Sequence, residues 1–219
     1  MTGSGAVALS PQAHDLRPPK EDLLRTLRDL YHHVPTTPEL VEVPAQRFLA
    51  LDGMGDPTDA GSFQSALASL YPVAYTLKFD RKAHGGDFRM MPVEADWWTG
   101  PGDRFDPGRP RSEWHWSVRL AVPLWVSLDE VRSAEREAAA RHPSRALQEV
   151  RLLTSHAGRA VHVLHVGPYS AEMPTIRRLW STIEGLGLRP TGRHHEIYLG
   201  DPRRSAPERL RTVLRQPVR

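Results

Sequence analysis

The segment Arg193–Leu199 carries the residues best suited to chemistry, and its alternation of polar and apolar side chains is typical of a strand. Successive side chains of a strand point to opposite faces. Ile197 and Leu199 therefore share one face with His195, and we expect that face to meet the core. The other face presents an imidazole, a carboxylate and a phenol, which come from His194, Glu196 and Tyr198.

Glu196 is the strongest candidate for a catalytic or ligand-binding group. If its carboxylate lines an apolar cleft, desolvation raises its pKa and it can act as a general base towards water. It can instead attract a delocalised cation without doing chemistry, or face solvent as an ordinary strand residue. The company of His194 and Tyr198 on the same face favours a cleft.

Two consecutive tryptophans, Trp97 and Trp98, end another predicted strand, so one can face the core while the other faces the cleft. We expect Trp98 in the cleft, because the residues that share its face are untypical of a core: Met90, Pro92, Glu94 and Asp96. On this interpretation, Glu94 and Asp96 form a second acidic spot near the cleft.

Three further aromatic residues are candidate ligand contacts. Trp114 and Trp116 share one face of the next predicted strand, where they either stack on a flat ligand or belong to the core. Tyr169 lies in the turn before a predicted helix, a position that is more often structural. Both alternatives stay open for each of them.

Composition and motifs exclude several kinds of site. The chain has no cysteine, which excludes disulfides, thiolate metal sites and a cysteine nucleophile. No predicted strand face combines two histidines with a carboxylate, and no glycine-rich phosphate loop or nucleotide fingerprint occurs. We therefore expect neither a metal nor another cofactor.

Charge and hydropathy restrict the partners. The 219 residues carry a net charge of only +3, and the arginines are scattered, a pattern that does not predict nucleic-acid binding. No apolar stretch approaches the ~20 residues that cross a bilayer. Residues 1–10 lack the charged start and apolar run of a signal peptide. We expect a cytoplasmic protein that binds a small molecule; the oligomeric state stays open.

Hydrophobic periodicity predicts an α+β fold. Helices are expected at residues 21–31, 62–79, 127–141 and 170–185, and strands at 47–53, 88–97, 113–122, 147–154, 160–166, 193–199 and 209–216. Ser127 and Glu130 predict a capping box, and Ser170 is expected to cap the last helix. Residues 1–19 are expected to be disordered, and residues 32–44 to form a linker.

The two halves of the chain share the order strand, helix, strand, strand, which we interpret as a tandem duplication of a βαββ unit. The expected division is a tail at 1–19, a helix and linker at 20–45, and one domain at 46–219. Within that domain, the first repeat covers about 46–123, a connecting helix 127–141, and the second repeat about 147–219.

Two such units joined as one antiparallel sheet place helices on one face. A ligand cleft is expected at the pseudo-twofold junction of the units. Glu196 lies in the second unit, and we expect it on the face opposite the helices.

Several segments resemble the GyrI-like small-molecule-binding proteins, in the same order along the chain. They are Leu40–Pro44 continued by Phe48–Pro57, Leu70–Phe79, Met91–Glu94 with Trp97-Trp98, and His195–Arg204. The resemblance covers about residues 20–219. It implies two βαββ units around a central cleft, the layout also expected from the repeat.

The resemblance also implies a function. Related domains of multidrug-sensing regulators bind aromatic cations through a buried glutamate, and stand-alone relatives are linked to hydrolysis of cyclopropane-bearing DNA-alkylating natural products. By resemblance, Glu196 takes the place of that glutamate, while Tyr198 and a tryptophan of the Trp97-Trp98 pair line the cleft. We expect no helix-turn-helix domain like that of the regulators within these residues.

The resulting hypothesis is a cofactor-independent hydrolase that gives drug resistance or detoxification. Glu196 would activate a water, and Tyr198 or His194 would donate a hydrogen bond to a developing oxyanion. The alternative is a protein that only sequesters flat aromatic or cationic compounds. A gyrase-modulating protein ranks last, because a net charge of +3 does not suggest an acidic DNA-mimicking surface.

Overall fold

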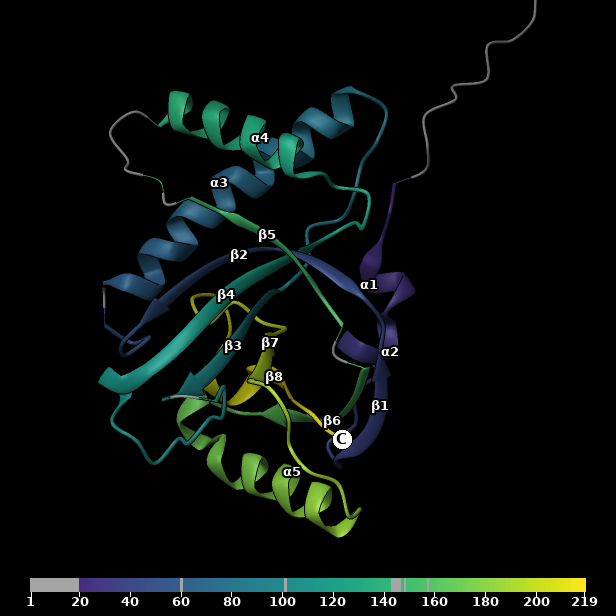
Figure 1. Cartoon of the computed structure of the whole chain (residues 1–219), viewed down its shortest axis with the longest axis vertical. Helices are drawn as coiled ribbons and strands as arrows, with labels where there is room; N and C mark the ends of the chain where they lie inside the picture. The colour runs from purple at the N-terminus through teal and green to yellow at the C-terminus, as the bar shows by residue number, and fades with distance from the viewer. Residues whose placement is uncertain (1–19, 60, 101, 143–146, 148, 157) are drawn as a thin grey trace, which may run out of the picture.

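The structure is a computed structural model that describes residues 20–59, 61–100, 102–142, 147, 149–156 and 158–219. The expected tail at residues 1–19 lies outside the described residues. Within the described part of the chain, eight strands form one curled antiparallel sheet (Figure 1). The strands are β1 Glu39–Val43, β2 Gln46–Met54, β3 Val93–Thr99, β4 Trp114–Val122, β5 Arg151–Ser155, β6 Gly158–Val166, β7 His194–Tyr198 and β8 Arg211–Pro217.

The strands lie in the order β1-β6-β8-β7-β3-β4-β2-β5, which places two repeats side by side. The first repeat is β2-α3-β3-β4, with α3 at Ser62–Ala83, and the second is β6-α5-β7-β8, with α5 at Met173–Gly185. The predicted α+β class and tandem βαββ duplication are confirmed. The repeats meet where β3 pairs with β7, so residues of these strands lie at the pseudo-twofold junction.

The edge strands β1 and β5 exchange partners between the repeats. β1 leads into β2 but pairs with β6, whereas β5 leads into β6 but pairs with β2. Because only residues 44 and 45 join β1 to β2, the two edges of the sheet must approach each other, which accounts for the curl. The expectation of a linker at residues 32–44 is therefore wrong for β1, whose backbone is paired in spite of the nearby prolines.

Helices α3 and α5 cover the same face of the sheet, which we call the helical face. Leu70 and Leu77 of α3 pack on one half of the sheet, and Ile176, Leu179 and Ile183 of α5 pack on the other. These spacings of three, four and seven residues place the apolar side chains on one side of each helix. α4, at Leu128–Arg141, packs against α3 and begins with the predicted capping box of Ser127 and Glu130.

The opposite face, which we call the inner face, is covered by the N-terminal segment. The predicted helix at 21–31 is two short helices, α1 Leu23–Thr26 and α2 Arg28–Tyr31, interrupted at Leu27. Their buried residues Leu24, Leu30 and Tyr31 join a core cluster with Phe48, Ile197 and Val213 of the sheet. Figure 1 shows α3 and α4 above the strands, α5 below them and α1 and α2 at the right.

The register of the sheet places Glu196 on the helical face. Glu196 pairs with Ala95 of β3 and with Leu214 of β8, and these two residues pack under α3 and α5 respectively. The expectation that Glu196 faces away from the helices is therefore wrong. No helix in the described part of the chain is both long and apolar enough to cross a membrane.

Candidate functional site

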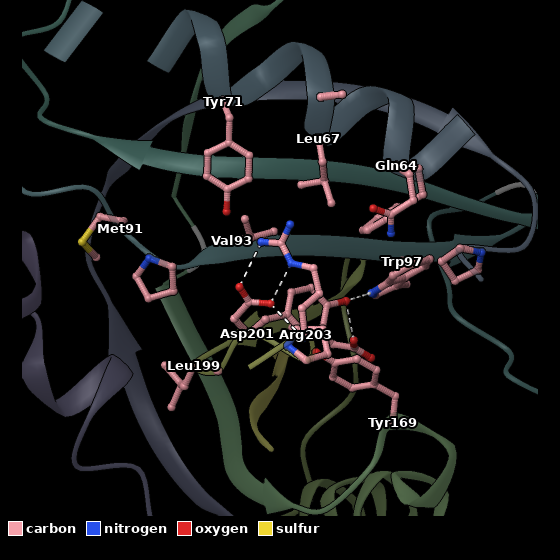
Figure 2. Close-up of a pocket in the computed structure, with 18 of the residues that line it drawn as sticks. Gln64, Leu67, Tyr71, Met91, Val93, Trp97, Tyr169, Leu199, Asp201 and Arg203 are labelled. Atoms are coloured by element: carbon pink, nitrogen blue, oxygen red, sulfur yellow. Dashed lines mark hydrogen bonds and ion pairs between the residues drawn. The ribbon is translucent and has the colours of Figure 1, made fainter. Parts of the chain in front are cut away.

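A cavity of about 1300 Å³ lies between α3 and α5, over the junction of β3 and β7 (Figure 2). Gln64, Leu67 and Tyr71 of α3 point into it from one side, and Tyr169 from the other. The strands supply its floor, which includes Val93, Trp97, Glu196 and Tyr198. Carboxyl groups, tyrosine and tryptophan rings and several apolar side chains thus share one space.

Glu196 lies at the base of the cavity and is held by Tyr198. The Tyr198 hydroxyl donates to Glu196 Oε2 at 2.7 Å, and Trp97 Nε1–H donates to the Tyr198 oxygen at 3.2 Å. Burial, together with the negative charges of Glu196 and Glu172, raises the pKa of Tyr198 well above its usual range. The phenol therefore stays protonated, and its proton serves to orient the Glu196 carboxylate.

Glu172 is a second carboxyl group in the cavity, and the sequence-based candidates did not include it. Its residue is only 7% exposed, and within the described residues its Oε1 accepts no hydrogen bond and no ion pair joins it to a cation. Burial and the negative charge of Glu196 raise the pKa of Glu172 from its usual 4.5 to about 9. Glu172 is therefore a carboxylic acid at neutral pH, close to the carboxylate of Glu196.

The turn before α5 positions Glu172. Gly167 has a φ of 136°, a conformation that glycine adopts far more readily than other residues. Tyr169–Ala171 then form a 3₁₀ turn, so that α5 begins at Met173 and Glu172 is its N-cap residue. The expectation that Ser170 caps this helix is wrong, because the chain completes the 3₁₀ turn before it enters the α-helix.

Tyr169 and Trp114 both lie on the cavity wall. The Tyr169 ring packs edge-on against Tyr198 at 5.6 Å, and burial raises the pKa of Tyr169 to about 12. Trp114 packs edge-on against Trp97 at 5.8 Å. Each ring thus touches a residue that belongs to the Glu196 hydrogen-bond chain.

The predicted orientation of the tryptophan pair is wrong, because Trp97 faces the cavity and Trp98 does not. Trp97 pairs with His194 across β3 and β7, which places it on the face of Glu196. Trp98 lies on the other face, where it stacks on His115 at 5.5 Å and under the Arg193 guanidinium at 3.5 Å.

Glu94 also lies outside the cavity, on the inner face. Tyr31 donates to its Oε1 at 2.6 Å, and His195 Nε2 lies 2.8 Å from its Oε2. His195 Nδ1 lies 2.7 Å from Asp96, which also forms an ion pair with Arg119. Glu94 and Asp96 are thus compatible with a buried face, because cations and hydroxyls pair with them there.

Trp116 belongs to the core and supports the aromatic wall from behind. Phe63 of α3 stacks on Trp97 at 5.6 Å, and Trp116 meets Phe63 edge-on at 5.1 Å. Gly53, the cross-strand partner of Trp116, makes room for the indole, since a Cβ at Gly53 would lie 2.1 Å from a Trp116 ring carbon.

His194 lies beneath the cavity floor rather than on it. It is fully buried and stacks on Phe105 at 5.3 Å, and its Nε2 lies 3.4 Å from Glu196 Oε1. Among the described residues neither ring nitrogen has a partner in hydrogen-bond geometry. His194 thus supports Glu196 by contact, and the loop that carries Phe105 closes the site on that side.

The sequence did not single out several cavity residues, and those that matter most for the Glu196 environment are Phe63, Phe105 and Glu172. Phe63 fits the apolar side of its helix and so does not stand out as a site residue, and Phe105 lies in a loop whose conformation no periodicity predicts. The signal for Glu172 was its place three residues after Tyr169, in the turn that leads to α5. In the described part of the chain, no three or more His, Cys, Asp or Glu side chains are grouped to hold a metal ion.

Comparison with known proteins identifies the family. The profile of the GyrI-like small molecule binding domain matches residues 128–219. An uncharacterized conserved protein from Listeria innocua is 35% identical in sequence and has a TM-score of 0.83, over 91% of this chain and 100% of its own. The chain belongs to the GyrI-like family of small-molecule-binding domains.

Some of the solved structures that are similar to this chain are described as hydrolases. One hydrolase from Listeria innocua is 33% identical, with a TM-score of 0.80 over 91% of this chain and 100% of its own. The EcmrR C-terminal domain, 13% identical with a TM-score of 0.52 over 84% of this chain and 97% of its own, shares the fold. A search of the curated proteins finds no match to this GyrI-like chain.

Proposed function

We propose that this GyrI-like protein hydrolyses flat aromatic compounds that carry an activated cyclopropane, and so protects a cell from such genotoxins. The observation that carries the proposal is the pair of buried carboxyl groups, Glu172 and Glu196, in one aromatic cavity. One of them is protonated at neutral pH and within the described residues has no cationic partner, which suits a proton donor. The 33% identity to hydrolases supports the reaction class.

Glu196 is the proposed general base. The hydrogen bond from Tyr198 fixes one carboxylate oxygen, and the other, which lies 3.4 Å from His194 Nε2, accepts a proton from water. The planar substrate lies against Trp97 and Trp114, which line the cavity, because aromatic rings favour offset or edge-on packing against a flat ligand. This position brings the strained ring close to the water that Glu196 activates.

Glu172 is the proposed general acid. Water attacks the cyclopropane methylene and forms a C–O bond, the adjacent C–C bond breaks, and its electron pair aromatises the ring that bears the conjugated carbonyl. Glu196 takes the proton of the water, and the carboxylic acid of Glu172 donates a proton to the carbonyl oxygen as it becomes a phenol. The sum is the addition of one water, and no cofactor takes part.

This assignment changes the role that the sequence suggested for Tyr198. Its proton already serves Glu196, so the cavity's available acid near neutral pH is Glu172. Tyr198 then orients the base rather than stabilising an oxyanion. His194 lacks hydrogen-bond geometry towards the cavity and is assigned a supporting role.

The test is incubation of the protein with a duocarmycin-type cyclopropanoid, followed by mass spectrometry of the small molecule. The expected product is heavier by one water and accumulates over many turnovers. Clear binding without that product would favour the rival function, in which the cavity only sequesters the compound. A matched control is Glu184→Gln, which removes an exposed carboxylate from the far end of α5 and should leave the rate unchanged.

A further inference from the structure

We infer that the cavity has a second compartment along α3, which binds an uncharged, planar aromatic arm of the same ligand whose reactive head reaches Glu196. We call this compartment the outer arm and define it by Tyr71, Tyr75 and Phe79 of α3 with Met90 and Met91 opposite. The inference rests on the proposed function for the head, but the recognition of the arm is a separate property of separate residues.

The length of the cavity is the first observation. Its lining residues on α3 include Gln64 near one end and Phe79 at the other, along one side of the helix. Fifteen residues of α-helix span about 22 Å. In Figure 2, Gln64 and Trp97 lie at one end and Met91 at the other, with Tyr71 between them. A ring system in contact with Glu196 covers only part of this length.

The stacking and solvent exposure of the aromatic rings on α3 are the second observation. Tyr71 and Tyr75 stack with centroids 6.3 Å apart and ring planes 24° apart, and Tyr75 and Phe79 stack at 6.0 Å and 23°. These rings form a row at four-residue spacing but remain 37%, 43% and 54% exposed. Folding has therefore left a continuous aromatic surface uncovered inside the mouth of the cavity, where a flat ligand can cover it.

The chemistry of the opposite wall is the third observation. Met90, Met91 and Leu199 are apolar, and thioether side chains adapt to aromatic rings of varied outline. The charges near this end are paired: Asp22 with Arg89 at 3.2 Å, and Asp201 with Arg203 at 2.9 Å. An arm that matches this compartment is flat and apolar and carries no net charge.

The difference between the deep end of the cavity and the outer arm determines how the ligand is oriented. The deep end holds Glu172 and Glu196, which act on a polar, reactive group, whereas the outer arm offers mainly ring faces and apolar side chains, and the charges beside it, Asp201 and Arg203, neutralise each other. The ligand is therefore bipartite, with a head for chemistry and an arm for affinity. Binding energy from the arm helps to hold the head against the carboxylates.

The experiment measures the affinities of two ligands for two protein variants, as in a double-mutant cycle, by quenching of tryptophan fluorescence. The two probes are a duocarmycin-type head that carries an indole arm and the same head capped with a small carbamate. The two proteins carry Glu196→Gln to suppress turnover, with or without Tyr71→Ala and Tyr75→Ala. We expect the arm to improve affinity about tenfold or more with the row intact and less than about threefold without it.

The outcomes separate this inference from the proposed function. If the indole arm improves affinity equally in both proteins, or in neither, the inference that the outer arm of the cavity binds it is overturned. Failure of wild-type protein to hydrolyse either probe overturns the catalytic proposal but leaves the affinity ratios interpretable. Tyr71→Phe with Tyr75→Phe keeps the rings and should keep the gain, and Leu186→Ala, an exposed apolar residue outside the cavity, is the neutral control.

Discussion

The acidic residues on the two faces of the central strands β3 and β7 differ in whether they have cationic partners. On the inner face, Glu94 and Asp96 are buried with His195, Tyr31 and Arg119, and each carboxylate is bonded to partners. On the helical face, Glu172 from a turn and Glu196 from β7 share one cavity, and within the described residues neither is paired with a lysine or arginine.

This difference shows how to separate structural from functional acids in the same sheet. A buried carboxylate that is fully paired holds the fold together, and its removal leaves its partners unpaired. Glu172 is a buried carboxyl group that lacks a cation among the described residues, so it has a raised pKa and a proton to give, as acid–base chemistry requires. The comparison predicts that inner-face variants lose stability whereas helical-face variants lose activity.

The largest effect on stability is expected for Glu94→Ala. It leaves the Tyr31 hydroxyl and the His195 imidazole without their shared acceptor, which costs about 3–5 kcal/mol of unfolding free energy. Urea denaturation measures the change. Glu42→Ala removes an exposed carboxylate from β1 and is the control. A loss below about 1 kcal/mol for Glu94→Ala would show that the inner network is not structural.

Much of the fold was predictable from the sequence, because apolar spacing records which side of an element is buried. The stripe of α5 and the capping box of Ser127 and Glu130 are local patterns, and both appear in the structure. The exchange of β1 and β5 was not predictable, since it depends on the meeting of distant edges. Glu196 and Tyr198 could be placed on one face by parity alone.

The orientation of Trp97 and Trp98 could not be predicted by the same reasoning. Parity gave two alternatives, and the choice rested on the assumption that Glu94 and Asp96 avoid a core. That assumption fails because Arg119 and His195 come from other strands to pair with them. Glu172 was missed for a related reason, because its environment is created by α5 and β7 together.

The second largest effect on stability is expected behind the aromatic wall. Gly53→Ala places a methyl group on the Trp116 indole, and overpacking of this kind costs about 1–3 kcal/mol. Ligand affinity should fall as well, because Trp116 supports Phe63 and thereby Trp97. Thermal unfolding and ligand titration measure both effects. Gly61→Ala, where a Cβ meets no atom within 4 Å, should change neither.

Glu172→Gln sharpens the comparison through pH. The pKa of Glu172 is raised to about 9 in the folded protein. Its contribution to the unfolding free energy is therefore fully present below pH 4.5 and is lost as the pH rises towards 9. Glutamine stays neutral, and the variant should therefore gain about 1–3 kcal/mol relative to wild type at pH 8, and little at pH 4. Denaturation across this range measures the gain. A gain that does not grow with pH would mean that Glu172 is already ionised at low pH.

The smallest expected effect on stability distinguishes the two tryptophans. Trp97→Phe keeps the stack on Phe63 but removes the hydrogen bond to Tyr198, at a cost of about 1 kcal/mol. Turnover should fall about three- to tenfold, because Tyr198 then orients Glu196 less well. The same change at Trp98, outside the cavity, should leave turnover intact, and equal losses in both variants would contradict the observed orientation.

The most direct measurement is the turnover of a duocarmycin-type cyclopropanoid by Glu196→Gln, followed by mass spectrometry beside a binding titration. Glutamine still accepts the Tyr198 hydrogen bond but cannot take a proton from water. We predict that formation of the water adduct falls about 100- to 10,000-fold while the dissociation constant stays within about threefold of the wild-type value. Turnover at the wild-type rate would contradict the role of Glu196 as the base.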